Sequence, residues 1–83
     1  MDWPQTYCAA LEKRAGRPLG LSDDEIEGVL DLARDVAHAT ERRFAPVSAY
    51  VAGKFVMNRV RDGASATDAV HEAQEVVGRL LGA

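Results

Sequence analysis

The chain has 83 residues, a mass of 9.0 kDa and a net charge of −3 at pH 7, which allow one domain and exclude two. Hydrophobic residues at 47% and charged residues at 28% are typical of a folded domain and exclude a disordered one. The acidic balance, with pI ≈ 5.2, lacks the basic footprint of a nucleic-acid-binding protein.

The single cysteine, Cys8, cannot close an intramolecular disulfide, and with only two histidines it cannot complete a four-ligand zinc site. We expect Cys8 to be a half-buried filler residue. The start at Met1 lacks the pattern of a signal peptide, and no run approaches the ~20 apolar residues of a membrane span. The sequence therefore predicts a soluble, cytoplasmic domain that binds no membrane and no nucleic acid.

The first helix is predicted over residues 3–15. Asp2 can cap it, and Pro4 is tolerated in a first turn, where its missing N–H has no intrahelical partner. Gly16 ends it. One apolar stripe recurs every four residues at Trp3, Tyr7, Leu11 and Ala15.

The second helix is predicted over residues 23–42. Ser22 and Glu25 have the spacing of a capping box, and Asp23 and Asp24 add negative charge at the positive end of the helix. An inner stripe is predicted at Ile26, Val29, Leu30, Ala33, Val36 and Ala37.

The third helix is predicted over residues 47–61, because Ala45 precedes a proline and is pushed out of the helical region. It is apolar on most of its circumference, which favours the buried centre of a bundle. Ala49 and Gly53 would let another backbone approach closely. One broad face holds Ala49, Tyr50, Gly53, Val56, Met57 and Val60, and a second holds Val47, Val51 and Phe55.

The fourth helix is predicted over residues 66–81, capped by Ser65 or Thr67. Its inner stripe is Ala66, Ala69, Val70, Ala73, Val76, Val77 and Leu80. Short loops between amphipathic helices favour antiparallel neighbours. The predicted fold is therefore all-α, a compact four-helix bundle of one domain over residues 1–83, with the third helix central.

Two copies of the pattern Asp-x-x-His, at Asp35–His38 and Asp68–His71, are similar to the metal-binding pattern of di-iron helical bundles. Both pairs lie on the outer side of their helical wheels, and the third helix contains no Glu. We therefore expect no metal centre, no cofactor and no catalytic residue, and interpret these side chains as solvated helix faces.

A polar flank at the junction of the second and third helices is one candidate site. Arg42, Arg43 and free N–H groups at Val47 and Ser48 would suit a phosphate or carboxylate. The alternative is that these side chains only form surface pairs along one helix. The residues of this polar site are Asp31, Arg34, His38, Arg42, Arg43 and Ser48.

The second face of the third helix is the other candidate. Val47, Val51 and Phe55 either complete the core or form a patch for a second chain. The charge pattern does not decide between these two readings.

Residues 30–38 (Leu-Asp-Leu-Ala-Arg-Asp-Val-Ala-His), together with residues 45–53, resemble a small helical domain family of unknown function from actinobacteria. Members of that family occur alone or fused to proteins similar to molybdenum-cofactor guanylyltransferases. The positions that match the recurring string are Asp31, Arg34, His38, Arg42 and Pro46. The resemblance implies a link to cofactor biosynthesis but no catalytic role, since this chain has no nucleotide-binding glycine loop.

The sequence thus favours a non-enzymatic helical accessory module that binds a protein partner or a second copy, in a context of molybdenum-cofactor biosynthesis or delivery. The alternative is a small-anion or nucleotide-phosphate binding domain that uses Arg42, Arg43 and the start of the third helix.

Overall fold

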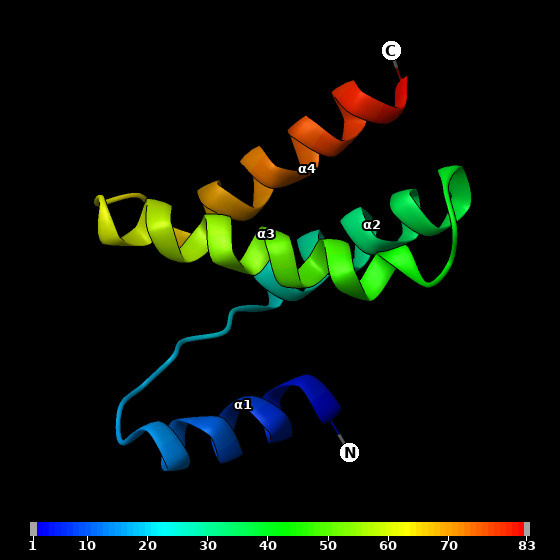
Figure 1. Ribbon diagram of the computed structural model, residues 1–83. Coiled ribbons are helices and arrows are strands. Elements are labelled where there is room, and N and C mark those ends of the chain that lie inside the picture. Colours follow the sequence, from blue (N-terminus) through cyan, green and yellow to red (C-terminus); the bar gives the residue numbers. More distant parts are fainter. Residues whose placement is uncertain (1, 83) are drawn as a thin grey trace.

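The computed structural model describes residues 2–82 and contains four helices joined by short connections (Figure 1). They are α1 (Trp3–Ala15), α2 (Asp23–Ala39), α3 (Phe44–Arg61) and α4 (Ala66–Gly82). No strand is present over this range, which confirms the predicted all-α fold with four helices. None of the helices among these residues is long and apolar enough to span a bilayer.

Side-chain caps define where three of the helices begin. The Asp2 carboxylate accepts a hydrogen bond from the N–H of Gln5 at 3.2 Å, at the start of α1. The predicted capping box of α2 is complete: Glu25 N–H donates to Ser22 Oγ at 3.1 Å, and Ser22 N–H donates to the Glu25 carboxylate at 3.0 Å. Ser65 Oγ accepts from Asp68 N–H at 3.0 Å before α4. These local signals are readable in the sequence because each cap depends on residues only three apart.

The junction of α2 and α3 differs from the prediction. α2 ends at Ala39, three residues early, because Thr40 leaves the helical region and its N–H and hydroxyl both donate to the Val36 carbonyl. α3 begins at Phe44 instead of residue 47, so that Pro46 lies inside the first turn. Proline is acceptable there because an N–H in the first turn has no intrahelical partner.

Helices α2, α3 and α4 pack against one another in all three pairings and enclose the core. One buried cluster joins Leu32 and Val36 of α2 to Ala52 of α3 and Ala73 of α4. The second joins Val56 of α3 to Ala69 and Val70 of α4. Leu32 is the largest side chain that is almost fully buried, with 1% of its surface exposed.

The buried faces of α2 and α3 are rotated relative to the predicted stripes. On α2, Leu32 lies in the core, whereas Leu30, a member of the predicted stripe, is 63% exposed. α3 contacts both α2 and α4, yet only Ala52 and Val56 are buried. Its predicted broad face lies largely outside, with Tyr50 68% exposed. Because α3 is apolar on most of its circumference, its sequence does not show which side faces the core.

The close backbone approach occurs at Gly28 of α2 and not at Gly53. A Cβ at Gly28 would lie 2.5 Å from Val70 Cγ1 of α4, so a larger residue would require the Val70 side chain or a helix to shift. A Cβ at Gly53 would meet no atom within 4 Å. Gly28 therefore sets how closely α2 and α4 approach, a role that one-dimensional spacing does not reveal.

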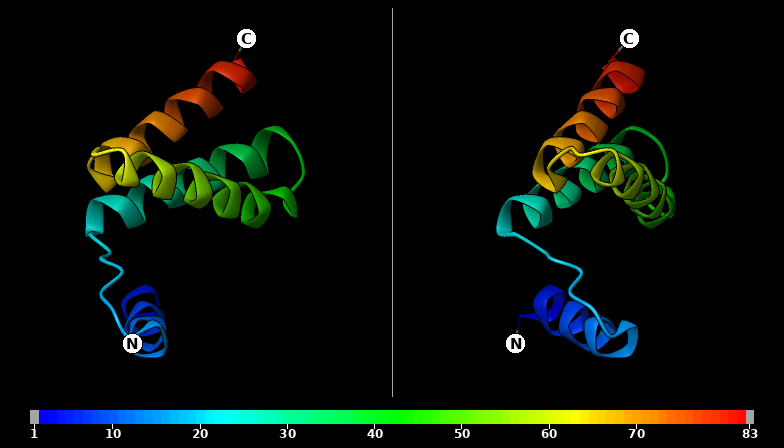
Figure 2. Two further views of the ribbon diagram at one scale, coloured as in Figure 1. Left: turned by 60° about the vertical axis from the view of Figure 1, so that its left-hand side comes forward. Right: turned by 90° about the vertical axis from the view of Figure 1, so that its left-hand side faces the viewer.

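Helix α1 stands apart from the other three (Figures 1 and 2). None of its residues is buried. Its connection to α2 is fixed mainly by polar contacts: the Glu12 carboxylate accepts from Leu19 N–H at 2.8 Å and Gly20 N–H at 3.3 Å, and Gln5 Nε2 donates to the Leu21 carbonyl at 3.1 Å. The core is thus formed by α2–α4, and α1 is an outlying helix.

Candidate functional site

An apolar groove lies between α3 and α4, where α4 diverges from α3 toward its C-terminal end (Figure 1). The groove has a volume of about 390 Å³. Its floor is formed by core residues of all three helices, Leu32, Ala52 and Ala73. Its walls are Val47, Val51 and Phe55 of α3 and Val76, Val77 and Leu80 of α4.

The side chains on the walls are unusually exposed for apolar groups. Val47 and Val51 are each 58% exposed, and Leu80 is 75% exposed. Phe55 is half-buried against the core cluster. The prediction for the second face of α3 left core and interface open, and the structure divides that face: Phe55 contributes to the core, whereas Val47 and Val51 line a groove.

The apolar stripe of α4 predicts that the α4 side of the groove belongs to the core. Ala69, Val70 and Ala73 of that stripe are buried as expected, but Val76 is 48% exposed and Leu80 lies at the groove edge. All the residues of this stripe recur at helical spacing, as the pattern predicts. Which of them reach the core depends on how far α4 diverges from α3, and no local pattern encodes that divergence.

A charged pair links α3 to α4 next to the groove. Arg59 donates from both Nε and Nη2 to the Glu72 carboxylate, at 3.1 and 2.7 Å, and its guanidinium lies 5.1 Å from the centre of the Phe55 ring. Both side chains are nearly half exposed, so the pair contributes at most about 1 kcal/mol. It joins the two helices one turn beyond Phe55.

The structure does not bring the predicted polar site together at a free helix start. Because α3 begins at Phe44, Val47 and Ser48 lie within the helix, and the N–H of Ser48 belongs to its backbone hydrogen bonding. The Phe44 and Ala45 N–H groups donate to the Glu41 and Arg42 carbonyls at 2.9 and 3.1 Å. The start of α3 therefore lies three residues before the predicted anion site, and Ser48 lines the apolar groove.

The charged members of that site form surface pairs or stand free of one another. Arg34 donates to the Asp31 carboxylate at 2.8 Å within one turn of α2. Arg43 donates to Glu41 at 3.4 Å and covers the ring of Phe44. No ion pair within residues 2–82 involves His38 or Arg42, both of which are exposed. The structure thus places Arg34, His38, Arg42 and Arg43 on the exposed surface.

The two Asp-x-x-His pairs also lie on the outside of the bundle. Asp35 and His38 on α2, and Asp68 and His71 on α4, are all exposed. Among the described residues, no three His, Cys, Asp or Glu side chains lie close enough together to hold a metal ion.

Cys8 lies on the side of α1 that faces α2 and is half-buried. Partial burial, followed by the nearby carboxylates of Glu12 and Glu25, raises the pKa of the Cys8 thiol above its usual value. A raised pKa disfavours the thiolate, so Cys8 is a poor nucleophile.

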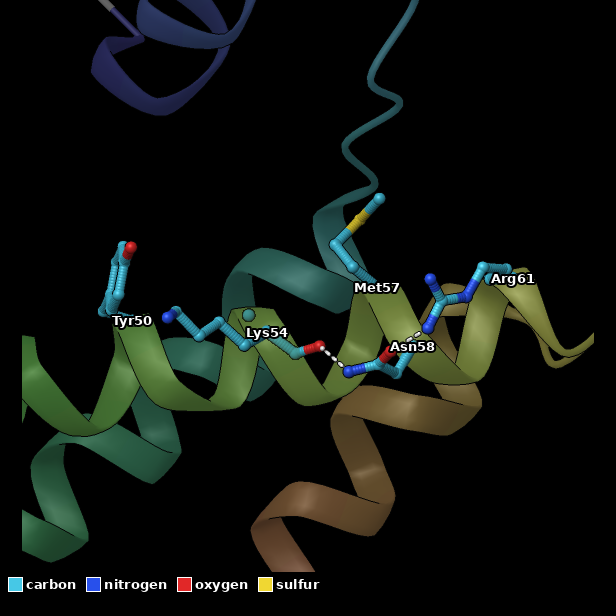
Figure 3. A pocket seen from close by; sticks show the side chains of 6 residues that line it. Tyr50, Lys54, Met57, Asn58 and Arg61 are labelled. Carbon is cyan, nitrogen blue, oxygen red and sulfur yellow. Dashed lines mark hydrogen bonds between the residues drawn. The ribbon is translucent and has the colours of Figure 1, made fainter.

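Another hollow lies on the outer face of α3 (Figure 3). It is a shallow depression in which Lys54 Nζ lies 5.1 Å from the centre of the Tyr50 ring and Asn58 Nδ2 donates to the Lys54 carbonyl at 3.2 Å. Arg61 in turn donates to Asn58. All of its lining residues belong to one helix, so it offers a surface and not an enclosed site.

Comparison with curated proteins and with solved structures finds no match. A family model does match, over residues 1–83, and it agrees with the expectation of a small domain of unknown function. The chain belongs to the family described as Domain of unknown function (DUF6457).

Proposed function

We propose that the chain is a non-enzymatic interaction module whose α3–α4 groove binds an amphipathic helix of a partner protein. The observation that carries this proposal is the open, apolar groove with Val51 and Leu80 on opposite walls. Apolar patches that stay exposed in a folded chain tend to be interaction sites.

The shape of the groove favours a helix as the ligand. Two helices that diverge from a common end leave a channel along which a third helix can lie, as in other helix-in-groove complexes. The ligand would present apolar residues at positions i, i+3 or i+4, and i+7. Its side chains would cover Val47, Val51 and Leu80, which the chain alone leaves in water.

A selection from a displayed library of helical peptides tests this proposal. We expect the selected peptides to share an apolar stripe and to shift the amide signals of Val51, Phe55 and Val76. Val51→Asp places a charge in the groove without touching the core, since Val51 is largely exposed. It should weaken peptide binding at least ~30-fold, the effect of losing one interface hot spot.

Met57→Asp is the matched control, because Met57 lies on the same helix, is 65% exposed and is not part of the groove. It should bind the peptides as the unaltered chain does. Peptides that bind the Val51→Asp and unaltered chains equally, or a library that yields no binder, would contradict the proposal.

The resemblance to domains fused to molybdenum-cofactor guanylyltransferase-like proteins suggests a class of partner. We propose that the natural ligand helix belongs to a protein of that cofactor pathway. Calorimetric titration of the chain with a guanylyltransferase-like protein from the same organism tests this finer point. Binding that survives Val51→Asp would place the contact elsewhere.

The alternative function, a small-anion or nucleotide-phosphate binding domain, has less support. Arg42 and Arg43 are exposed near the start of α3, but the backbone N–H groups beside them donate to carbonyls of the chain. Titration with inorganic phosphate, followed through the amide signals of Phe44, Val47 and Ser48, distinguishes the two functions.

A further inference from the structure

The chain exposes more surface than a monomer of its size normally does. Folded monomers of 9.0 kDa expose about 4,900 Å² by the usual scaling of surface with mass. This chain exposes 6263 Å². The excess of about 1,400 Å² is larger than the ~800 Å² that each partner buries in a standard interface. The radius of gyration, 13.2 Å, also exceeds the ~12 Å expected for this length.

Part of the exposed apolar surface lies on α1, which buries none of its residues. Trp3 is 62% exposed and stacks on Tyr7, which is 52% exposed, with 5.5 Å between ring centres. The apolar side of α1 faces the first half of α2 across an open crease of about 390 Å³. We call this the α1–α2 crease; its main apolar side chains are Tyr7, Leu11, Leu21, Ile26, Val29 and Leu30.

We propose that two copies of the chain pair through the α1–α2 crease, with α1 of each copy inserted against α1 and α2 of the other. An isolated helix of 13 residues is marginal in water, so α1 needs a surface that covers its stripe. Helix α1 forms one wall of the crease, so it cannot also occupy the crease of its own chain. The α1 helix of a second copy can occupy it.

Twofold symmetry requires a surface that is complementary to itself. The crease meets this requirement because it combines an apolar channel with an apolar helix that stands apart from the core. In the symmetric pair each α1 fills the crease of the partner, and the exposed Leu30 of each chain lies against the partner's helix.

Charge favours an antiparallel arrangement of the two α1 helices. Each begins with Asp2 and ends with Lys13 and Arg14. An antiparallel pair brings the basic end of one helix to the acidic end of the other, which also opposes the helix dipoles favourably. No ion pair within residues 2–82 uses these three charges. The Asp2 carboxylate accepts from Gln5 N–H, and a carboxylate can accept further hydrogen bonds from a partner.

This surface is separate from the α3–α4 groove, and the inference does not rest on the proposed function. A dimer of this kind would present two α3–α4 grooves, one for each copy. The two ideas therefore fail independently: a change in the crease should affect self-association alone, and a change in the groove should affect peptide binding alone.

Sedimentation velocity of the full chain from about 1 µM to about 1 mM tests the proposal. We expect twice the mass of 9.0 kDa at the upper concentrations. Leu30→Glu should weaken the dimer at least ~30-fold, because the charge enters the interface twice by symmetry. Leu30 is outside the core, so cooperative urea unfolding of the variant confirms that its α2–α4 core folds.

Two control variants locate the interface. Met57→Glu, at an equally exposed position on α3, and Val51→Asp in the groove should both leave the dimer intact. Trp3 provides a local reading, because it is the one tryptophan of the chain. Its emission should shift to the blue as the dimer forms, and Leu30→Glu should abolish that shift.

Three outcomes would overturn the inference. They are a monomer at every concentration, an assembly of three or more copies, and a dimer that Leu30→Glu leaves intact. A dimer that Val51→Asp disrupts and Leu30→Glu does not would assign self-association to the α3–α4 groove instead.

Discussion

Helices α1 and α4 both carry one apolar stripe and both begin at a side-chain cap, yet their surroundings differ. α4 buries Ala69, Val70 and Ala73 against its neighbours. α1 buries none of its residues and stands apart from the bundle. The comparison teaches that an amphipathic stripe shows only that a helix has a face to cover. What covers that face is decided by the rest of the molecule or by a partner.

The two regions should also differ in how they respond to change. The α2–α4 core is formed by side chains from three helices, so a substitution in it should lower the free energy of unfolding of the whole core. α1 is held by local caps and by the polar contacts of Glu12 and Gln5. A substitution in α1 should therefore reduce the helicity of α1 without changing the stability of the core.

The largest expected contrast is between two leucines. Leu32→Ala removes a side chain that is 1% exposed and leaves a cavity, so it should lower the free energy of unfolding by about 2–5 kcal/mol. Leu11→Ala on α1, which is 40% exposed, should cost about 1 kcal/mol or less in dilute protein. Urea denaturation followed by circular dichroism measures both. Equal losses would mean that α1 belongs to the same cooperative unit as the core.

Two glycines give the next contrast. Gly28→Ala places a Cβ 2.5 Å from Val70 Cγ1, whose side chain is buried and β-branched, and should destabilise the chain by about 1–3 kcal/mol. Gly53→Ala meets no atom within 4 Å and should stabilise the chain by up to about 1 kcal/mol through helix propensity. Thermal unfolding distinguishes them. A stabilising Gly28→Ala would show that α2 and α4 can separate without cost.

The N-terminal caps of α1 and α2 give the next contrast, with smaller expected effects on stability. Ser22→Ala removes the cap of α2 and should cost about 1 kcal/mol of global stability. Asp2→Ala removes the same kind of cap from α1 and should leave the midpoint of global unfolding unchanged while lowering the far-ultraviolet helical signal. A shift of that midpoint by Asp2→Ala would tie α1 to the core.

The smallest expected effect concerns Cys8. Its raised pKa, caused by partial burial and then by Glu12 and Glu25, should make alkylation by iodoacetamide at about pH 8 slower in the folded chain than in the urea-unfolded chain. The folded chain holds the thiol proton more tightly, so the associated stability is complete below the unfolded pKa and is lost as pH rises through the folded pKa. Equal rates would show that α1 does not shelter the thiol.

Local patterns accounted for much of the fold. α1 occupies Trp3–Ala15, and α4 ends one residue beyond the predicted end, because caps and glycine stops act over three or four residues. The start of α3 differs from the prediction because the first turn of a helix accepts Pro46. The end of α2 differs because Thr40 leaves the helical region. The earlier start of α3 places Val47 and Ser48 of the predicted anion site inside the helix.

One wall of the α3–α4 groove is predictable from the sequence. Val47, Val51 and Phe55 stand out because a helix that is apolar all round has more apolar surface than one core can use. The opposing wall, with Val76 and Leu80, was assigned to the core, because a stripe on a helical wheel does not show how far two helices diverge.

The sequence by itself determined the class of fold, the capping of the helices and the surplus of apolar residues, because these depend on residues within one or two turns of each other. Only the tertiary structure decided that Leu32 and not Leu30 enters the core, that Gly28 is the close contact, and that α1 remains uncovered. These outcomes depend on helix rotation and divergence, which arise from the packing of all three core helices together and leave no mark on the periodicity of any one of them.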